Sequence, residues 1–195
     1  MKLREEILKE HSKAQCNKIV RWVAADQGRF DELFDLFLHD EYSVVQRSAW
    51  PVSYCVIAHP VFIKKHWDKF IQQLKKPCIH DSVKRNSIRL LQDIEIPEKY
   101  RGEIMNICFK YLESPAEAVA VKAFSLTVLG NLSKYYPEII PEIKLVVEDQ
   151  LPNQTAAFKS RAKKLLKLES SQHFFVGNTD SGPLSHKNTG GDGCF

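Results

Sequence analysis

A short segment recurs along this chain at nearly constant spacing. Residues 45–49 have the sequence VQRSA, and similar segments begin at Val83, Val121 and Phe158, at steps of 38, 38 and 37 residues. This period is typical of proteins built from stacked helical hairpins, in which each hairpin buries its apolar face against the next one. The repeat therefore predicts an elongated all-α fold and, by itself, no particular function.

The composition agrees with a helical domain in a reducing compartment. Only Gly28, Gly102 and Gly130 occur before residue 169, and sparse glycine favours helices. The five cysteines are odd in number and widely spaced, which excludes a disulfide framework and predicts buried, reduced thiols. Because no signal peptide or apolar run of about 20 residues is found, we expect a cytoplasmic protein that does not span a membrane.

The apolar spacing and the prolines predict two helices in each repeat. A first helix covers 29–39, and three more are introduced by the prolines of His59-Pro60, Ile96-Pro97 and Tyr136-Pro137. Ser114 followed by Pro115 is expected to cap one second helix. The predicted second helices cover 42–58, 81–93, 115–134 and 154–168.

These helices suggest three parts of the chain. Residues 1–28 are predicted to form an N-terminal helical cap that ends at Gly28. Residues 29–168 would then form about four hairpins. Residues 169–195 are rich in polar and helix-breaking residues and are predicted to be a flexible tail, in which residues 174–176 are an apolar island.

The recurring segments resemble HEAT repeats, and the chain as a whole is similar to small bacterial HEAT-like proteins. In that family, the second helix begins with a valine, then a basic residue, then a small residue four positions after the valine. Val83-Lys84 with Ser87 and Val121-Lys122 with Ser125 fit this pattern, while Phe158 replaces the valine in the last copy. The resemblance covers about residues 29–168 and implies a right-handed α-α superhelix whose second helices line a concave face.

A row of basic residues is the best candidate for a binding surface on that face. Lys84, Lys122 and Lys159 share one repeat position, and Arg47 and Arg85 lie on the same set of helices. Such a row would attract an acidic peptide or a phosphate backbone. The alternative is that this position makes the hydrogen bonds between repeats that are typical of the family.

The occurrence of tryptophan near cations in the sequence suggests a second possible function, the binding of nucleic acid. Trp50 is a candidate for the concave surface, where it would stack on a base as in HEAT-like alkylpurine DNA glycosylases. Asp40 or Glu41 would then supply the carboxylate. Trp22 and Trp67 lie in apolar helix patterns and are predicted to be core residues.

No motif in the sequence assembles catalytic chemistry. Cys78, His80 and Asp81 form a single local cluster without a second one to complete a metal site, and no nucleophile elbow or glycine-rich phosphate loop is present. We therefore predict no catalytic residue, no metal and no cofactor. The leading hypothesis is a non-enzymatic scaffold that binds a protein or acidic peptide partner. The alternatives are a DNA-binding or DNA-repair protein and a structural subunit of a larger assembly.

Overall fold

The chain is helical throughout the part that the structure describes. This computed structural model describes residues 1–151 and 154–176, with residues 167–176 as backbone alone. No strand occurs among these residues, which confirms the predicted all-α class. The helices are α1 (Leu3–Lys9), α2 (Lys13–Val23), α3 (Gln27–His39), α4 (Tyr42–Ala58), η1 (Pro60–His66), α5 (Trp67–Lys75), α6 (Asp81–Leu91), α7 (Glu98–Glu113), α8 (Val119–Leu132), η2 (Pro137–Ile139), α9 (Ile140–Gln150) and α10 (Ala156–Val176), where η marks a 3-10 helix.

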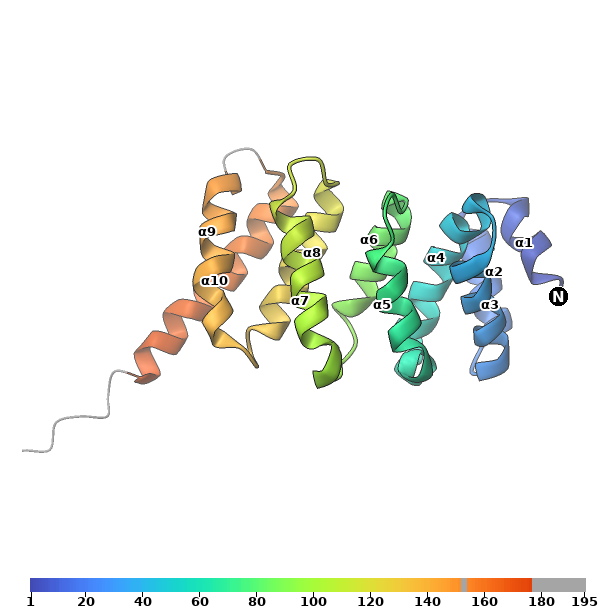
Figure 1. The fold of residues 1–195 in the computed structure, drawn as a ribbon, viewed down its shortest axis with the longest axis horizontal. Helices are drawn as coiled ribbons and strands as arrows, with labels where there is room; N and C mark the ends of the chain where they lie inside the picture. Colours follow the sequence, from blue (N-terminus) through green and yellow to red (C-terminus); the bar gives the residue numbers. More distant parts are fainter. Residues whose placement is uncertain (152–153, 177–195) are drawn as a thin grey trace, which may run out of the picture.

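The helices form hairpins that stack side by side into an elongated molecule (Figure 1). The second helices α2, α4, α6, α8 and α10 each contact the next one along the stack, and we call them the second-helix layer. The helices α3, α5, α7 and α9 form the first-helix layer, and α1 packs against α2 and α4. This is the arrangement that the repeat period predicts.

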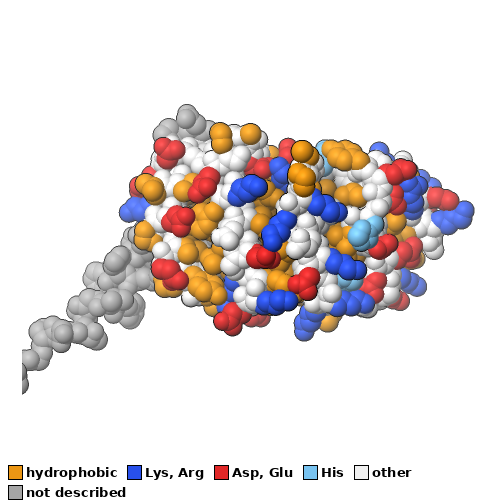
Figure 2. Space-filling model, viewed as in Figure 1, with side chains coloured by type: hydrophobic (Ala, Val, Ile, Leu, Met, Phe, Trp, Pro, Cys, Tyr) orange, Lys and Arg blue, Asp and Glu red, His pale blue; other side chains and the backbone are white. Residues whose placement is uncertain are grey.

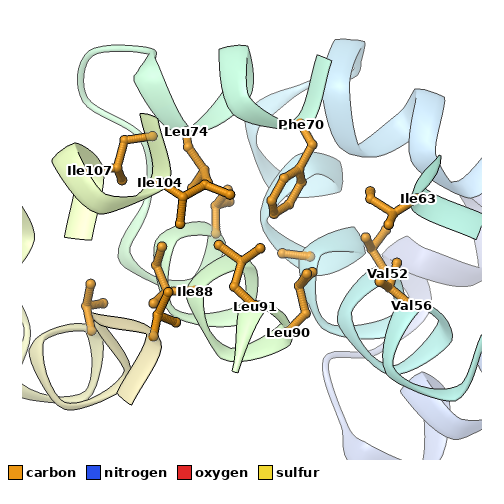
Figure 3. Packing of buried hydrophobic residues seen from close by; sticks show 14 of the residues in the cluster. Val52, Val56, Ile63, Phe70, Leu74, Ile88, Leu90, Leu91, Ile104 and Ile107 are labelled. Atoms are coloured by element: carbon orange, nitrogen blue, oxygen red, sulfur yellow. The ribbon is translucent and has the colours of Figure 1, made fainter. Parts of the chain in front are cut away.

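One apolar core runs between the two layers along the whole stack. Phe30, Leu33, Phe34 and Phe37 recur at helical spacing in α3, and all four side chains are fully buried. Figure 3 shows how buried side chains of α4, α5, α6 and α7 meet without a break between one hairpin and the next. Each buried side chain of this size contributes about 1.5–3 kcal/mol, so this core is a main source of the stability of the stack.

Two of the predicted first helices begin differently from the expectation. Pro60 and Pro137 begin the 3-10 helices η1 and η2, which lead into α5 and α9. A proline at a helix start fixes a φ angle that α and 3-10 helices share, so the sequence pattern does not separate the two.

Two predicted helix ends are wrong. Helix α8 begins at Val119 rather than residue 115, and Ser114 is the C-cap of α7. The intervening turn is held by Glu117, which accepts a hydrogen bond from Lys84. Gly28 lies in the first turn of α3, while α2 ends earlier at the C-cap Ala24, whose φ is 49°.

The C-terminal helix is longer than expected. Helix α10 continues past residue 168 through Val176, so it includes the apolar island at 174–176. Residues 177–195 lie outside the described residues, and their flexibility stays a prediction. The division of the chain at residue 168 also stays a prediction.

A side chain of each following first helix donates a hydrogen bond to a main-chain carbonyl at the end of the first helix before it. The last carbonyls of a helix have no partner within that helix, so these bonds satisfy acceptors that would otherwise be buried without a donor. We call this set the carbonyl ladder. Its bonds are Gln73 Nε2 to Phe37 O at 3.3 Å, Tyr111 Oη to Leu74 O at 3.3 Å, and Gln150 Nε2 to Leu112 O at 2.9 Å.

Candidate binding surface

Acidic residues are almost absent from the second helices. Helices α2, α4 and α8 contain none, α6 contains only Asp81, and α10 contains none before Glu169, whereas all of these helices carry Lys or Arg. The first helices carry both signs, and Figure 2 shows acidic and basic side chains intermixed on their side of the molecule. The exposed side of the second-helix layer, which we call the second-helix face, is therefore the more basic one.

Lys84 of the predicted basic row lies between two hairpins. Its Nζ is 2.8 Å from Glu117 Oε2 and 3.5 Å from Asp81 Oδ1, and 5.6 Å from the ring centroid of Tyr111. Burial alone lowers the pKa of Lys84, but the hydrogen bond to Glu117 and the attraction of both carboxylates outweigh burial and raise it. Lys84 is thus a charged contact between α6 and the turn before α8.

Lys122 takes the same role one repeat later with a different partner. Its side chain is buried, and Nζ donates a hydrogen bond to Gln150 Oε1 at 2.9 Å, which joins α8 to the end of α9. Burial lowers the pKa of Lys122, and the attraction of Glu117 offsets this only in part. Both lysines therefore make the contacts between repeats that were the alternative to ligand binding.

The remaining basic residues of the prediction differ in their surroundings. Arg47 is half-buried and donates from Nη1 to the carbonyl oxygen of Leu8 at 2.7 Å, which joins α4 to α1. Lys159 is half-buried in the first turn of α10 and also has a partner. Arg85 is exposed and makes no ion pair within the described residues. Arg85 is thus the predicted residue that is placed best to meet a ligand.

Trp50 is half-buried in α4 and belongs to a group that spans two hairpins. Its ring centroid is 6.3 Å from that of Tyr54. The guanidinium carbon of Arg89 lies 4.8 Å from the Tyr54 ring centroid, and its Nη2 is 3.4 Å from the hydroxyl. The hydrogen bond from Arg89, together with the charges of Arg89 and Lys13, lowers the pKa of Tyr54. With Arg85, which lies one turn before Arg89, these residues form what we call the aromatic–arginine patch.

A second contact between a cation and an aromatic ring lies nearer the C-terminus. The guanidinium carbon of Arg161 is 5.1 Å from the ring centroid of Phe124, and Nη1 donates to Gln92 Oε1 at 2.7 Å and also to Thr127 Oγ1. These bonds join α10, α8 and α6, so Arg161 is occupied within the protein.

Sequence reasoning missed the role of Tyr54. The available signal was the spacing of Trp50 and Tyr54, which places both rings on one side of α4.

The carboxylates considered for DNA chemistry lie away from the patch. Asp40 Oδ2 is 2.9 Å from Arg4 Nε, and Glu41 Oε2 is 3.1 Å from Arg4 Nη2, in the turn between α3 and α4. Trp67 is buried and Trp22 packs against the core, as predicted. Among the described residues, no group of three or more His, Cys, Asp or Glu side chains is arranged to hold a metal ion.

The cysteines correct one expectation. Cys16, Cys55 and Cys108 are buried, and burial raises the pKa of each thiol to about 12. Cys78 is exposed instead, with a φ of 56° in the turn between α5 and α6. Cys194 lies outside the described residues.

The family model described as HEAT repeat domain matches residues 3–168. The chain belongs to this family. The matched region begins in α1, so the HEAT repeat domain includes the N-terminal hairpin that the sequence suggested as a cap. No curated protein and no solved structure matched the chain. In the described part of this HEAT repeat domain, no helix has the length and apolar character that crossing a membrane requires.

Proposed function

We propose that this HEAT repeat domain is a non-enzymatic scaffold whose second-helix face binds an acidic segment of a protein partner. The observation that carries the proposal is the near absence of acidic residues from the second helices, which leaves the exposed cations of α2, α6 and α10 with few carboxylates beside them. Extended faces of this kind are how stacked repeat proteins bind their partners. The aromatic–arginine patch is the proposed centre of binding.

The proposed contacts differ from the basic row of the sequence prediction. Lys84 and Lys122 are engaged between hairpins, so they support the stack rather than the partner. Lys13 and Arg85 are exposed and make no ion pair within the described residues. Trp50 and Tyr54 add partly exposed aromatic surface, and aromatic and arginine side chains are enriched where protein interfaces gain most of their affinity.

The contacts favour a protein partner over a nucleic acid. A nucleic-acid surface must neutralise several phosphates at once, and each phosphate needs an available cation. Arg89 already lies on Tyr54, and Arg161 is bonded to Gln92 and Thr127. Cations that lie beside aromatic rings suit a short acidic segment better than a long phosphate backbone.

A charge-reversal pair tests the proposal. The double variant Lys13→Glu, Arg85→Glu changes two exposed side chains of the second-helix face, whereas reversal at Lys84 or Lys122 would break contacts between hairpins. The matched control is Lys64→Glu, Lys69→Glu, which reverses two exposed cations of η1 and α5. Affinity capture from the native lysate, with and without nuclease, should recover an acidic partner with the wild type and the control but not with the double variant. Capture that survives the double variant, or that disappears with nuclease, would overturn the proposal.

No observation favours a subunit buried in a larger assembly. The exposed large apolar side chains of the described residues lie on separate elements, including Tyr42 in α4, Val61 in η1 and Leu145 in α9. Single exposed apolar residues are normal on a soluble protein surface, whereas a buried subunit needs a continuous apolar patch.

A further inference from the structure

A pocket lies between α5 and α7, and the turns that lead into α6 and α8, together with Lys84 of α6, also line it. Its volume is about 520 Å³, within the range of small-molecule sites. Ile79, Ile107 and Tyr111 give it apolar walls, and Lys76, Lys110 and Asn106 contribute polar groups. On the face shown in Figure 2, hydrophobic and basic side chains adjoin one another in the region of α5 and α7.

The negative charges of this pocket are already neutralised. Glu103 Oε1 is 2.7 Å from Lys75 Nζ, and Glu117 Oε2 is 2.8 Å from Lys84 Nζ. The side chain of Glu117 is only 6% exposed, so its carboxylate belongs to the contact between hairpins rather than to the open pocket. These pairs leave the pocket with cations that have no carboxylate of their own.

Lys110 and Lys76 are those cations. Lys110 is exposed, and its ammonium group makes no ion pair or hydrogen bond within the described residues. It also borders a second hollow, of about 590 Å³, on the other side of α7, where Phe109 and Ile139 contribute apolar surface. Lys76 donates one hydrogen bond to the carbonyl oxygen of Leu38 at 3.2 Å, and an ammonium group has two further N–H donors.

We propose that the α5–α7 pocket binds a small organic anion, a carboxylate or phosphate carried on an apolar body. The anion pairs with Lys110 and Lys76, and the apolar body contacts Ile79, Ile107 and Tyr111. Charge complementarity selects an anion over a neutral or cationic ligand, and the size of the pocket suits a small molecule. Because its walls come from two successive hairpins, a bound ligand joins them and stabilises the folded state.

Cys78 provides a reporter for this site. It is the exposed cysteine of the described residues and it lines the pocket, so a ligand there shields its thiol. The experiment measures the rate at which neutral iodoacetamide alkylates Cys78, followed by peptide mass spectrometry, in a Cys194→Ser background. Hexyl phosphate and hexanoate are the anionic probes, with hexanol and hexylamine as neutral and cationic controls. At twice its Kd, an anionic probe should slow alkylation about threefold, since two thirds of the sites are then occupied.

Variants assign the protection to the proposed lysine. Lys110→Gln should weaken the protection, Lys110→Glu should abolish it, and Lys69→Glu, an exposed lysine of α5, should leave it unchanged. Thermal midpoints verify that each variant is folded. The Lys13→Glu, Arg85→Glu double variant should also keep the protection, so this site and the second-helix face are tested separately.

Three outcomes would overturn the proposal. The first is no protection by either anion at millimolar concentrations. The second is protection that hexylamine or hexanol matches, or that Lys110→Glu leaves intact, because apolar contact alone would then explain it. The third is protection by a short glutamate-rich peptide but by neither small anion, which would make the pocket a peptide site.

Discussion

At the scale of single residues, Lys122 shows what it costs to place an ammonium group between hairpins. The side chain is 5% exposed, and its partner is the neutral amide oxygen of Gln150. Burying a charge is unfavourable unless good contacts compensate for the lost hydration. That amide oxygen also accepts from Gln154 Nε2 at 3.2 Å, so it keeps a donor if the lysine is removed.

We therefore predict that Lys122→Met is as stable as the wild type at pH 7, or more stable by up to about 1 kcal/mol. Because burial lowers the folded-state pKa of Lys122, the unfolded chain binds the proton more tightly. The free energy of unfolding of the wild type should therefore rise relative to that of the variant as the pH increases through the folded pKa toward 10.5. Urea unfolding at pH 7 and pH 10 measures both effects, with Lys69→Met as an exposed control. A loss above about 1 kcal/mol at pH 7 would mean that the bond to Gln150 dominates.

The ionised carboxylate of Asp31 in α3 should account for part of the loss of stability at low pH. Burial raises its pKa, but hydrogen bonds from Lys65, Gln27 and His66 outweigh burial and lower the pKa to about 2. A carboxylate with a lowered folded-state pKa stabilises the protein above its unfolded value, and this contribution disappears as the pH falls from about 4 toward 2.

Asp31→Asn should lose about 1 kcal/mol at pH 7, a figure reduced because the side chain is 32% exposed and screened by water. The difference from the wild type should shrink at pH 3. Urea unfolding at both pH values measures this. Asp35→Asn, at a 73% exposed side chain, serves as the control and should change stability by less than about 0.5 kcal/mol. A difference that stays constant between the two pH values would contradict the assignment to ionisation.

At the scale of helices, the carbonyl ladder links the end of each first helix to the next hairpin. Tyr111→Phe removes the hydroxyl that donates to Leu74 O and retains the ring beside Lys84. A buried hydrogen bond of this kind contributes about 1 kcal/mol, so we predict a loss of that size in the free energy of unfolding. Tyr135→Phe, at a 54% exposed ring, should have no measurable effect. An unchanged free energy of unfolding in Tyr111→Phe would contradict this prediction and would mean that another donor bonds to Leu74 O in the variant.

The sequence predicted the helices better than it predicted their polar contacts. Residues 42–58 were predicted as a helix and α4 has those bounds, because the apolar spacing and the repeat both mark that segment. The partners of Lys84 and Lys122 could not be predicted from their shared position. They depend on the next hairpin, which supplies Glu117 from a turn in one case and Gln150 from a helix in the other.

The candidate surface could be predicted only in part, for a related reason. Arg85 and Trp50 were selected from the repeat and from residue type. Tyr54 and Arg89 contact each other across two hairpins, and neither belongs to the recurring segment. A period identifies positions that all repeats share, whereas a binding surface is made by the positions at which they differ.

At the scale of the whole molecule, each hairpin packs mainly against its neighbours, and the bond from Arg161 to Gln92 reaches one hairpin further. The hairpins α1–α2 and α9–α10 have a neighbour on one side within the described residues, and the inner hairpins have one on each side. The stability of such a stack is close to a sum of hairpin and interface contributions, so the ends open more readily than the middle. Hydrogen–deuterium exchange should therefore be slowest in α4, α6 and α8, and faster in α2 and α9. Equal protection along the stack would show that it unfolds as a single cooperative unit.

The two kinds of contact between hairpins differ in how specific they are for the next repeat. The carbonyl ladder uses main-chain acceptors at the ends of α3, α5 and α7, and two different donor types, Gln and Tyr, satisfy them. The lysine contacts are specific to one pair of neighbouring hairpins each. Lys84 bonds to Glu117 of the next hairpin, and Lys122 bonds to Gln150 of the next hairpin. Gln150 takes part in both kinds of contact, since its Nε2 donates to Leu112 O and its Oε1 accepts from Lys122. Each of the two lysines therefore makes its contact between hairpins only with the hairpin that follows it in this chain.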